Sequence, residues 1–459
     1  MKEFSVKALA DIIRPQSVIN TEGAFTGVSI DSRTTKAGDC FFAIAGENFD
    51  GQDFVTDAFA KGAACAVIRD GKDKQFADKT ILKVNDTIKA LGDFAAQYRQ
   101  KNNFKVVAIT GSVGKTTTRQ IVAHALSRHY RLFQAPKNYN NKIGLPLTLL
   151  GADPADQIVI AELGSNCPGE IAYLTAIAKP DIAIVTNAHP SHLAGFGSLQ
   201  TIVEEKLSIS RGLRPDGMFI INGDCEQLVN ACRTKNIEFI TFGKSKTCDI
   251  QKQNITCGDF GSTFTVNGSK ITLPLLGAGN VENATAAWSV CSRLGMSIDD
   301  FTQAAKTLAP VSMRTELLQI GTLTVLNDCY NANPTSMKNA LDILASLTGS
   351  PAHNRRFAFI CGDMDELGPQ SQALHARLGA SIAQAKVQFL LTVGRFAKIT
   401  AETAKKSANY DLQTKSFEDA PSACNNLKES IKDSDIILVK GSRVNKLETV
   451  VEKLKELFV

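Results

Sequence analysis

One stretch of the sequence, K105-V-V-A-I-T-G-S-V-G-K-T-T-T118, reads as a buried strand, a glycine-bounded turn and the start of a helix. The glycines of such a turn let the backbone approach an anion, and N–H groups at the helix start bind phosphate oxygens. Lys115 is placed to neutralise β- and γ-phosphates, and the Thr116 hydroxyl can ligate Mg²⁺. The stretch therefore predicts an ATP site that is formed by Gly111, Ser112, Val113, Gly114, Lys115, Thr116 and Thr117.

The match is to the shortened pattern G-x-x-G-K-T, because Ile109 stands where the full phosphate-loop pattern has its first glycine. The alternative is a glycine-rich turn with a chance lysine. The apolar strand before the turn and the amphipathic run I121-V-A-H-A-L126 after it favour the phosphate loop.

Length and composition indicate a multidomain globular protein. A chain of 459 residues usually forms more than one core, so we expect two to four domains. The content of hydrophobic residues, 44%, is that of an ordinary globular protein. No apolar run approaches the ~18 residues that a membrane span needs, and the N-terminus lacks a signal-peptide core. We therefore expect a cytoplasmic protein without membrane insertion.

Charge and cysteine content exclude further classes. The net charge of +5 is small for this length and is not gathered in runs, which argues against a nucleic-acid-binding surface. The 11 cysteines are scattered without a C-x-x-C pair, which is typical of a reducing compartment and not of a zinc site. A monomer is the default expectation.

The sequence divides into three segments, and the predicted fold class is α/β with three domains. Residues 1–100 alternate short apolar strands with Gly/Asp turns, which predicts a small mixed α/β module. In residues 101–309, apolar strands at 106–109, 158–161, 182–185 and 218–221 alternate with helical runs, which predicts a mostly parallel sheet. We expect a small antiparallel piece within 239–276. Residues 310–459 repeat the α/β pattern with strands at 323–326, 357–360, 389–393 and 436–439.

Polar or glycine residues directly follow each strand of the third segment, among them Asp328. Because ligands bind at the carboxyl ends of parallel strands, we expect this edge to face the ATP. Asp328 is a candidate for the ribose hydroxyls, or else a turn-forming residue. The amide-rich loop Y330-N-A-N-P-T-S-M337 beside it favours binding.

Four more side chains of the second segment are candidates for chemistry. Glu162 closes a strand at the same sheet edge as the phosphate loop, where it could hold Mg²⁺ or be only a solvated acid or helix cap. His189 and His192 share a loop, and one of them is a candidate metal ligand, although loop histidines are often merely exposed. Lys206 cannot ligate Mg²⁺ as an ammonium, so its residue type alone favours a solvated helix lysine.

The whole chain resembles the Mur ligase family, the ATP-dependent ligases that form the amide bonds of the peptidoglycan stem peptide. The motifs that carry the resemblance include G27-V-S-I-D-S-R33, T110-G-S-V-G-K-T-T117, N138-Y-N-N-K-I-G-L145, G277-A-G-N-V-E-N-A284, D328-C-Y-N-A-N-P-T-S336, G362-D-M-D-E-L-G368 and K440-G-S-R443. D-x-Y-N-A-N-P with G-D-M-x-E-L-G most closely resembles the members that add D-alanyl-D-alanine to UDP-N-acetylmuramoyl-tripeptide.

The resemblance implies a UDP-substrate-binding domain (1–100), a central ATP-binding domain (101–309) and a C-terminal Rossmann-like domain (310–459). It implies two Mg²⁺ ions, one held by Thr116 and Glu162 and the other by Glu162, His192 and a carbamylated Lys206. With Lys115, the residues Glu162, His192 and Lys206 form the implied catalytic set. Asn280 is implied to meet the adenine, Asp328 the ribose, Arg314 the phosphates, Ser32, Arg33, Asn138 and Asn141 the UDP-linked substrate, and Tyr330, Asn331 and Asn333 the acceptor dipeptide. Gly279 stands where the family usually has histidine.

The implied reaction activates the substrate carboxylate as an acyl phosphate, which the amine of the dipeptide then attacks. Three alternatives stay open. A sister ligase that adds a diamino acid would share the ATP site, but the sequence has no D-N-P-R motif. A folylpolyglutamate-type ligase would lack the first segment, and a nucleotide-dependent switch would have no ligase activity.

Overall fold

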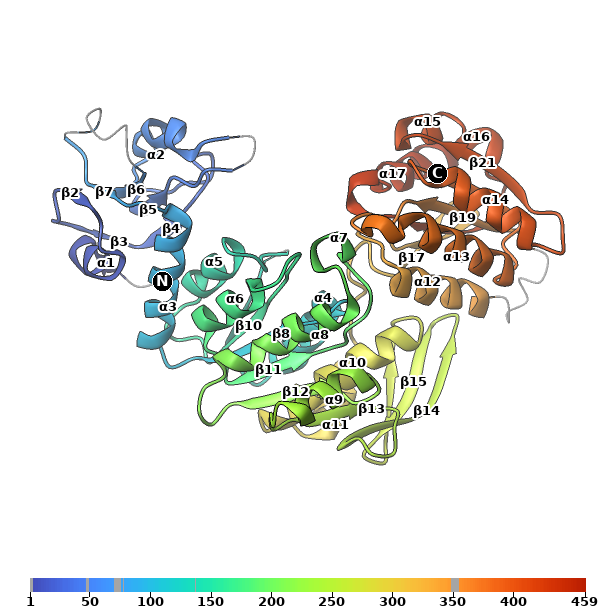
Figure 1. The fold of residues 1–459 in the computed structure, drawn as a ribbon, viewed down its shortest axis with the longest axis horizontal. Helices are drawn as coiled ribbons and strands as arrows, with labels where there is room; N and C mark the ends of the chain where they lie inside the picture. Colours follow the sequence, from blue (N-terminus) through green and yellow to red (C-terminus); the bar gives the residue numbers. More distant parts are fainter. Residues whose placement is uncertain (1–2, 47–48, 70–75, 77, 137, 348–354) are drawn as a thin grey trace.

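The computed structural model describes residues 3–46, 49–69, 76, 78–136, 138–347 and 355–459. Three α/β domains follow one another along the chain (Figure 1). The N-terminal domain and the C-terminal domain lie at opposite ends of the view, and the central domain lies between and below them. The predicted three-domain α/β class is confirmed, while the exact domain bounds stay a prediction.

The first domain is built on a five-stranded sheet of order β2-β7-β6-β5-β4, in which only β2 is antiparallel to its neighbour. A two-stranded sheet pairs β1 with β3. The strands are β1 (Phe4–Ser5), β2 (Ser17–Ile19), β3 (Ala24–Phe25), β4 (Gly27–Ser29), β5 (Asp39–Phe42), β6 (Cys65–Ile68) and β7 (Ile81–Lys83). The helices are α1 (Val6–Ile13), η1 (Gly51–Phe54), α2 (Val55–Ala60) and α3 (Thr87–Lys101).

Helix α3 joins the first domain to the central one. It begins at Asp86, whose carboxylate accepts the N–H groups of Ile88 and Lys89 at 2.8 and 3.0 Å. Phe94 packs inside the first domain, while the Tyr98 hydroxyl donates to the Ala152 carbonyl of the central domain at 2.7 Å. One helix therefore contributes to both domains, and the boundary that we predict near residue 100 corresponds to its last turn.

The central sheet has nine strands in the order β16-β15-β14-β13-β12-β11-β8-β10-β9. Its strands are β8 (Lys105–Thr110), β9 (Leu132–Gln134), β10 (Ile158–Glu162), β11 (Ile182–Val185), β12 (Met218–Asn222), β13 (Ile240–Gly243), β14 (Ile250–Gly258), β15 (Gly261–Val266) and β16 (Ser269–Leu273). All four predicted strands are present. The antiparallel piece begins later than expected, because β13 still pairs parallel with β12 and with β14.

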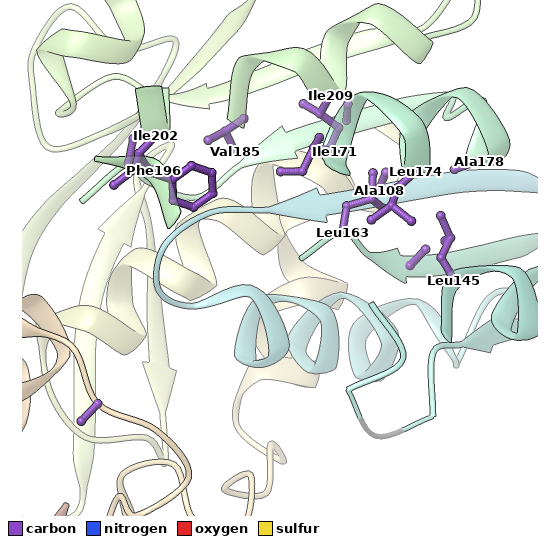
Figure 2. Packing of buried hydrophobic residues seen from close by; sticks show 14 of the residues in the cluster. Ala108, Leu145, Leu163, Ile171, Leu174, Ala178, Val185, Phe196, Ile202 and Ile209 are labelled. Carbon is purple, nitrogen blue, oxygen red and sulfur yellow. The ribbon is translucent and has the colours of Figure 1, made fainter. Parts of the chain in front are cut away.

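Helices cover both faces of this sheet, as predicted. Side chains of β8 alternate between two cores: Ala108 lies in one, and Val107 and Ile109 lie in the other. Figure 2 shows the first of these cores, where Leu145, Ile171 and other labelled side chains pack beside the sheet. The helices of the domain are α4 (Lys115–Leu126), α5 (Gly144–Gly151), α6 (Glu170–Ala178), α7 (Leu193–Phe196), α8 (Leu199–Leu207), η3 (Ser208–Gly212), α9 (Glu226–Thr234), α10 (Ala278–Arg293) and α11 (Ile298–Ala305).

The C-terminal sheet has the order β17-β18-β22-β19-β20-β21, and only β17 is antiparallel to its neighbour. The strands are β17 (Glu316–Ile320), β18 (Leu323–Asn327), β19 (Phe357–Gly362), β20 (Phe389–Val393), β21 (Gln413–Phe417) and β22 (Ile436–Lys440). The helices are α12 (Pro334–Ser346), η5 (Gly368–Gln370), α13 (Ser371–Gln384), α14 (Ala397–Ser407), α15 (Ala420–Asn425), α16 (Leu427–Ser430), η6 (Arg443–Asn445) and α17 (Glu448–Phe458). Within the described ranges, no helix is long and apolar enough to cross a membrane.

Candidate active site

The phosphate-loop prediction falls on a tight turn between β8 and α4. Gly111 and Gly114 both have positive φ, 147° and 88°. A Cβ at Gly111 would lie 2.0 Å from Oγ1 of Thr186, and one at Gly114 would lie 2.1 Å from Oδ1 of Asn283, so both positions require glycine. Gly114 also has no side chain to cap α4, and the first N–H groups of a helix lack carbonyl partners within it. The turn therefore presents a helix start to an anion.

The segment after β11 fixes this turn from the other side. Asn187 accepts the Ser112 N–H with its carbonyl at 3.1 Å and the Val113 N–H with its side chain at 2.9 Å. The Ser112 hydroxyl donates to the carbonyl of His189 at 2.8 Å and accepts its N–H at 2.9 Å. Of the two loop histidines, His189 thus acts on the phosphate loop through its main chain. Because the N–H groups of Ser112 and Val113 are already bonded to Asn187, the N–H groups available to phosphate oxygens begin at Gly114.

Two cations contribute positive charge at the turn. Lys115 is half-buried and donates from Nζ to the Gly111 carbonyl at 2.6 Å. Burial lowers the pKa of Lys115 to about 8, Glu162 opposes that shift, and the charge of Arg314 from the C-terminal domain adds to it. The structure therefore brings the predicted Arg314 into the electrostatic neighbourhood of Lys115. A site with this excess of positive charge favours a polyanion.

Glu162 lies at the end of β10 and is buried, so its interpretation as a solvated acid is wrong. Its Oε2 accepts the Thr116 hydroxyl at 3.1 Å, which joins the two predicted metal ligands. Its Oε1 accepts Nε of Arg119 at 2.7 Å. Sequence reasoning missed Arg119, which lies one turn after Thr116 on α4 and also donates to Gln134 and to the Ala135 carbonyl. A buried ion pair therefore holds the carboxylate beside the phosphate loop.

We expect Arg119→Met to lower the free energy of unfolding by about 3–5 kcal/mol, because it leaves the Glu162 charge buried without its partner. Urea denaturation measures this loss. Arg128→Met is the matched control, since Arg128 is exposed just beyond the same helix, and its effect should stay within about 0.5 kcal/mol. Equal effects of the two substitutions would refute the structural role of the pair.

Lys206 is buried and not solvated, which overturns the expectation from residue type. Its Nζ donates to the Ser165 hydroxyl at 2.8 Å and lies 5.6 Å from the ring centre of Phe196. Phe196 and Ile202, both labelled in Figure 2, are members of the first of the two cores. Burial, with the nearby charge of Lys115, lowers the pKa of Lys206 to about 7. Much of this lysine is therefore a neutral amine near neutral pH, the form that reacts with CO₂.

The neighbouring Glu205 does not neutralise Lys206 through an ion pair. Its carboxylate accepts the N–H groups of Gly169 and Ile171 at 2.7 Å each, at the start of α6. The acid therefore serves as a helix cap, and its raising effect on the pKa of Lys206 does not offset the lowering by burial and by Lys115.

His192 faces the C-terminal domain. It precedes α7 with φ 50°, and its Nδ1 is hydrogen-bonded to Oε2 of Glu366. Next to it, the Ser191 hydroxyl donates to the Ser112 hydroxyl of the phosphate loop at 3.2 Å. Sequence reasoning noted the motif that contains Glu366 but gave this residue no role.

The polar edge predicted for the C-terminal domain forms at the ends of β18 and β22. Asp328 accepts the Thr315 N–H at 3.0 Å and Nζ of Lys440 at 2.6 Å. Lys440 is buried, and sequence reasoning noted the motif that it opens but gave this residue no role. The Arg314 guanidinium stacks on the Tyr330 ring, 4.1 Å from its centre. Tyr330 thus orients a predicted phosphate-binding arginine.

Asn280 connects the two domains at this edge. It lies near the start of α10 and donates from Nδ2 to the Leu276 carbonyl at 2.9 Å and to the Thr315 hydroxyl at 3.1 Å. Thr315 is also bonded to Asp328. The residues predicted for adenine and for ribose therefore belong to one hydrogen-bonded cluster.

Two predicted acceptor-binding residues have structural roles. Asn333 caps α12 by accepting the Ser336 N–H at 2.9 Å, and the Ser336 hydroxyl accepts the Asn333 N–H in return. The Asn331 side chain accepts the Ala332 N–H at 2.8 Å. Their part in binding the dipeptide stays a prediction.

The residues predicted for the UDP-linked substrate lie on two domains. Ser32 is buried and Arg33 is paired with Asp31 at 2.7 Å, both just after β4. The hydrogen bond from Arg33 lowers the pKa of Asp31 to about 2. Asn138 is exposed, and Asn141 accepts the Ile143 and Gly144 N–H groups at the start of α5. Because α5 contacts β4, the four residues border the junction of the first and central domains.

The donor set fits Mg²⁺ that is bound together with phosphates. Among the residues described, no group of three or more His, Cys, Asp or Glu side chains forms a preassembled metal site. Mg²⁺ typically takes one or two carboxylates and completes its shell with phosphate and water oxygens. Glu162 and Thr116 supply such hard oxygen ligands beside the phosphate loop.

Family models match three parts of the chain. The model of the Mur ligase family catalytic domain matches residues 24–99, that of the Mur ligase middle domain 109–291, and that of the Mur ligase glutamate ligase domain 313–443. The chain is also 35% identical to the UDP-N-acetylmuramoyl-tripeptide–D-alanyl-D-alanine ligase of Bacillus subtilis, with 99% of both chains covered. The chain belongs to the Mur ligase family. It is therefore an enzyme, an ATP-dependent ligase.

Solved structures of other Mur ligases show the same three-domain fold. MurF from Acinetobacter baumannii has a TM-score of 0.89 and 29% identity, covering 99% of both chains. The MurF ligase from Thermotoga maritima in complex with ADP has a TM-score of 0.80 and 25% identity, covering 94% of this chain and 97% of that one. The similarity extends over the first domain, which a folylpolyglutamate-type ligase was expected to lack.

Proposed function

We propose that this Mur ligase adds D-alanyl-D-alanine to UDP-N-acetylmuramoyl-tripeptide, with hydrolysis of ATP to ADP and phosphate, in cytoplasmic peptidoglycan precursor synthesis. The observation that carries the proposal is similarity to a ligase named for that reaction over 99% of both chains. The geometry supports it, because a phosphate loop, a buried acid and a C-terminal polar edge face one ATP site. We also propose that the enzyme is monomeric.

In the proposed mechanism, the phosphate loop and Lys115 hold the phosphates of ATP, while the terminal carboxylate of the tripeptide attacks the γ-phosphorus. The bond from γ-phosphorus to the bridging oxygen breaks, and ADP leaves. Arg314, stacked on Tyr330, adds positive charge to the same site from the C-terminal domain. We expect closure of the domains over the site to keep water from hydrolysing the acyl phosphate.

The amine of D-alanyl-D-alanine then attacks the acyl carbon, the tetrahedral intermediate expels phosphate, and the amine loses a proton. When bound, Mg²⁺ supplies charge neutralisation along the phosphoryl-transfer path. We propose Thr116 and Glu162 as ligands of one ion, and Glu162, His192 and carbamylated Lys206 as ligands of a second. The depressed pKa and apolar surroundings of Lys206 support the carbamate, which would replace a buried cation with an anion.

The choice of acceptor tests the proposed function. Phosphate release should require both UDP-N-acetylmuramoyl-tripeptide and D-alanyl-D-alanine. The sister-ligase reaction, a diamino acid with the UDP-linked dipeptide precursor, should give only background release. The reverse preference would assign the chain to the sister ligase, and release with ATP alone would favour the nucleotide-dependent switch.

We expect Asp328→Asn to raise the KM for ATP about tenfold or more while lowering kcat less, because ribose contacts are similar in the ground and transition states. Asparagine keeps the size of the side chain, and Lys440 retains its bonds to the main-chain carbonyls of residues 328 and 331. Steady-state kinetics with varied ATP measure the split. An equal loss in kcat and kcat/KM would contradict the ribose role.

A further inference from the structure

The contact between His192 and Glu366 crosses from the central domain to the C-terminal domain. Glu366 follows β19 and His192 follows β11, so the two residues are far apart in sequence. The Ala194 N–H donates to the Glu366 carbonyl at 2.9 Å, and Gly368 packs against Ala194. The contact between the two domains therefore combines a side-chain hydrogen bond, between His192 and Glu366, with a main-chain hydrogen bond, from Ala194 to Glu366.

The Glu366 segment is fixed within its own domain. Glu366 itself has φ 60°, a left-handed conformation that residues other than glycine adopt rarely. The preceding Asp365 N–H donates to the hydroxyl of buried Ser442 at 2.7 Å. The carboxylate thus reaches His192 from an anchored loop that follows β19.

The bond leaves one nitrogen of His192 available. Nδ1 is bonded to Glu366, whereas Nε2 has no hydrogen bond to any residue in the described part of the chain. A carboxylate that accepts from one ring nitrogen fixes the tautomer in which the other carries the lone pair. Ser191, next to His192, is bonded to the phosphate loop, so this lone pair belongs to a residue at the edge of the ATP site.

We propose that Glu366 is a positioning residue that holds the His192 imidazole through Nδ1, so that Nε2 binds a divalent cation only when the C-terminal domain is docked. This inference rests on the proposed metal role of His192. The inference assigns a function to Glu366, to which we attribute no substrate contact. It also makes metal binding in the central domain depend on the position of the C-terminal domain.

Nitrogen NMR of the metal-free protein with labelled histidines tests the tautomer. At a pH of about 8.5, well above the usual histidine pKa of about 6.5, wild-type His192 should carry its proton on Nδ1. In Glu366→Ala the proton should move largely to Nε2. Asp365→Asn is the matched control, because it removes the adjacent exposed charge but not the contact, and it should resemble wild type. His192→Ala assigns the signal. The same His192 tautomer in wild type, Glu366→Ala and Asp365→Asn would overturn the inference.

Binding of Mn²⁺, followed by electron paramagnetic resonance with a non-hydrolysable ATP analogue, tests the consequence. Glu366→Ala should weaken Mn²⁺ binding about 10- to 100-fold. Glu366→Gln should recover part of that loss, because its amide oxygen still accepts from Nδ1. If His192→Ala binds Mn²⁺ like wild type, the proposed metal role of His192 fails and this inference fails with it. If His192→Ala weakens binding and Glu366→Ala does not, this inference alone fails.

Discussion

Lys115→Ala should lower kcat about 10³-fold or more, because Lys115 neutralises charge that develops on the transferring phosphoryl group. The side chain already lies over the loop, bonded to the Gly111 carbonyl, and burial has lowered its pKa to about 8. A phosphate-release assay with saturating UDP-N-acetylmuramoyl-tripeptide and D-alanyl-D-alanine measures the loss of kcat. Affinity for the UDP-linked substrate should change little, since we place that site mainly on the first domain.

Lys105→Ala is the control for Lys115. Lys105 is exposed at the opposite end of the same strand, so its removal changes the net charge equally without touching the phosphate loop. It should keep nearly full activity. Near-normal turnover of Lys115→Ala would contradict the assignment of the phosphate loop.

Lys206→Ala should be almost inactive yet folded, and acetate should restore part of the activity. A carbamate supplies two oxygens of the kind that Mg²⁺ prefers, and a small carboxylate can occupy the space that alanine leaves. Because the side chain is buried against Phe196 and Ser165, that space is enclosed by the protein. Activity with increasing acetate measures the rescue, and circular dichroism verifies folding.

The exposed Lys235 at the end of α9 provides the matched control for Lys206. Lys235→Ala should keep wild-type activity with no effect of acetate. Wild-type activity in Lys206→Ala would remove the carbamate from the mechanism, while the ATP site and the ligase function would stand.

The pKa of Lys206 also predicts the direction of a pH effect. Only the neutral amine reacts with CO₂. Because the pKa of Lys206 in the folded protein is about 7, much of this lysine is neutral at and above neutral pH. Carbamate formation should therefore decrease as the pH falls through about 7. An unperturbed lysine would show this decrease near its usual pKa of about 10.4.

The strands and the phosphate loop could be predicted because their signals are local. Runs such as 182–185 are continuously apolar, as strands buried on both faces must be, and the structure places β11 there. The glycines of the phosphate loop are similarly explicit, since Gly111 and Gly114 occupy conformations that favour glycine. Parallel pairing then brings the polar residues after each strand to one edge.

The partners of the site residues could not be predicted, because they join distant positions. Arg119 meets Glu162 across 43 residues, Lys440 meets Asp328 across 112, and Glu366 meets His192 across 174. No periodicity in the sequence encodes those pairings. The burial of Lys206 could not be predicted for the same reason. Two acids next to it on its helix suggested exposure to solvent, yet the Lys206 side chain lies over the ring of Phe196.

The measurement that tests the central claim most directly follows a heavy-oxygen label from the terminal carboxylate of the UDP-linked tripeptide. Attack of that carboxylate on ATP transfers one of its oxygens to phosphorus, so each released phosphate should carry one labelled oxygen and the new amide should keep the other. Mass spectrometry of the phosphate and of the dipeptide-extended product reads both. Unlabelled phosphate, formed together with the extended product, would contradict ligation through an acyl phosphate.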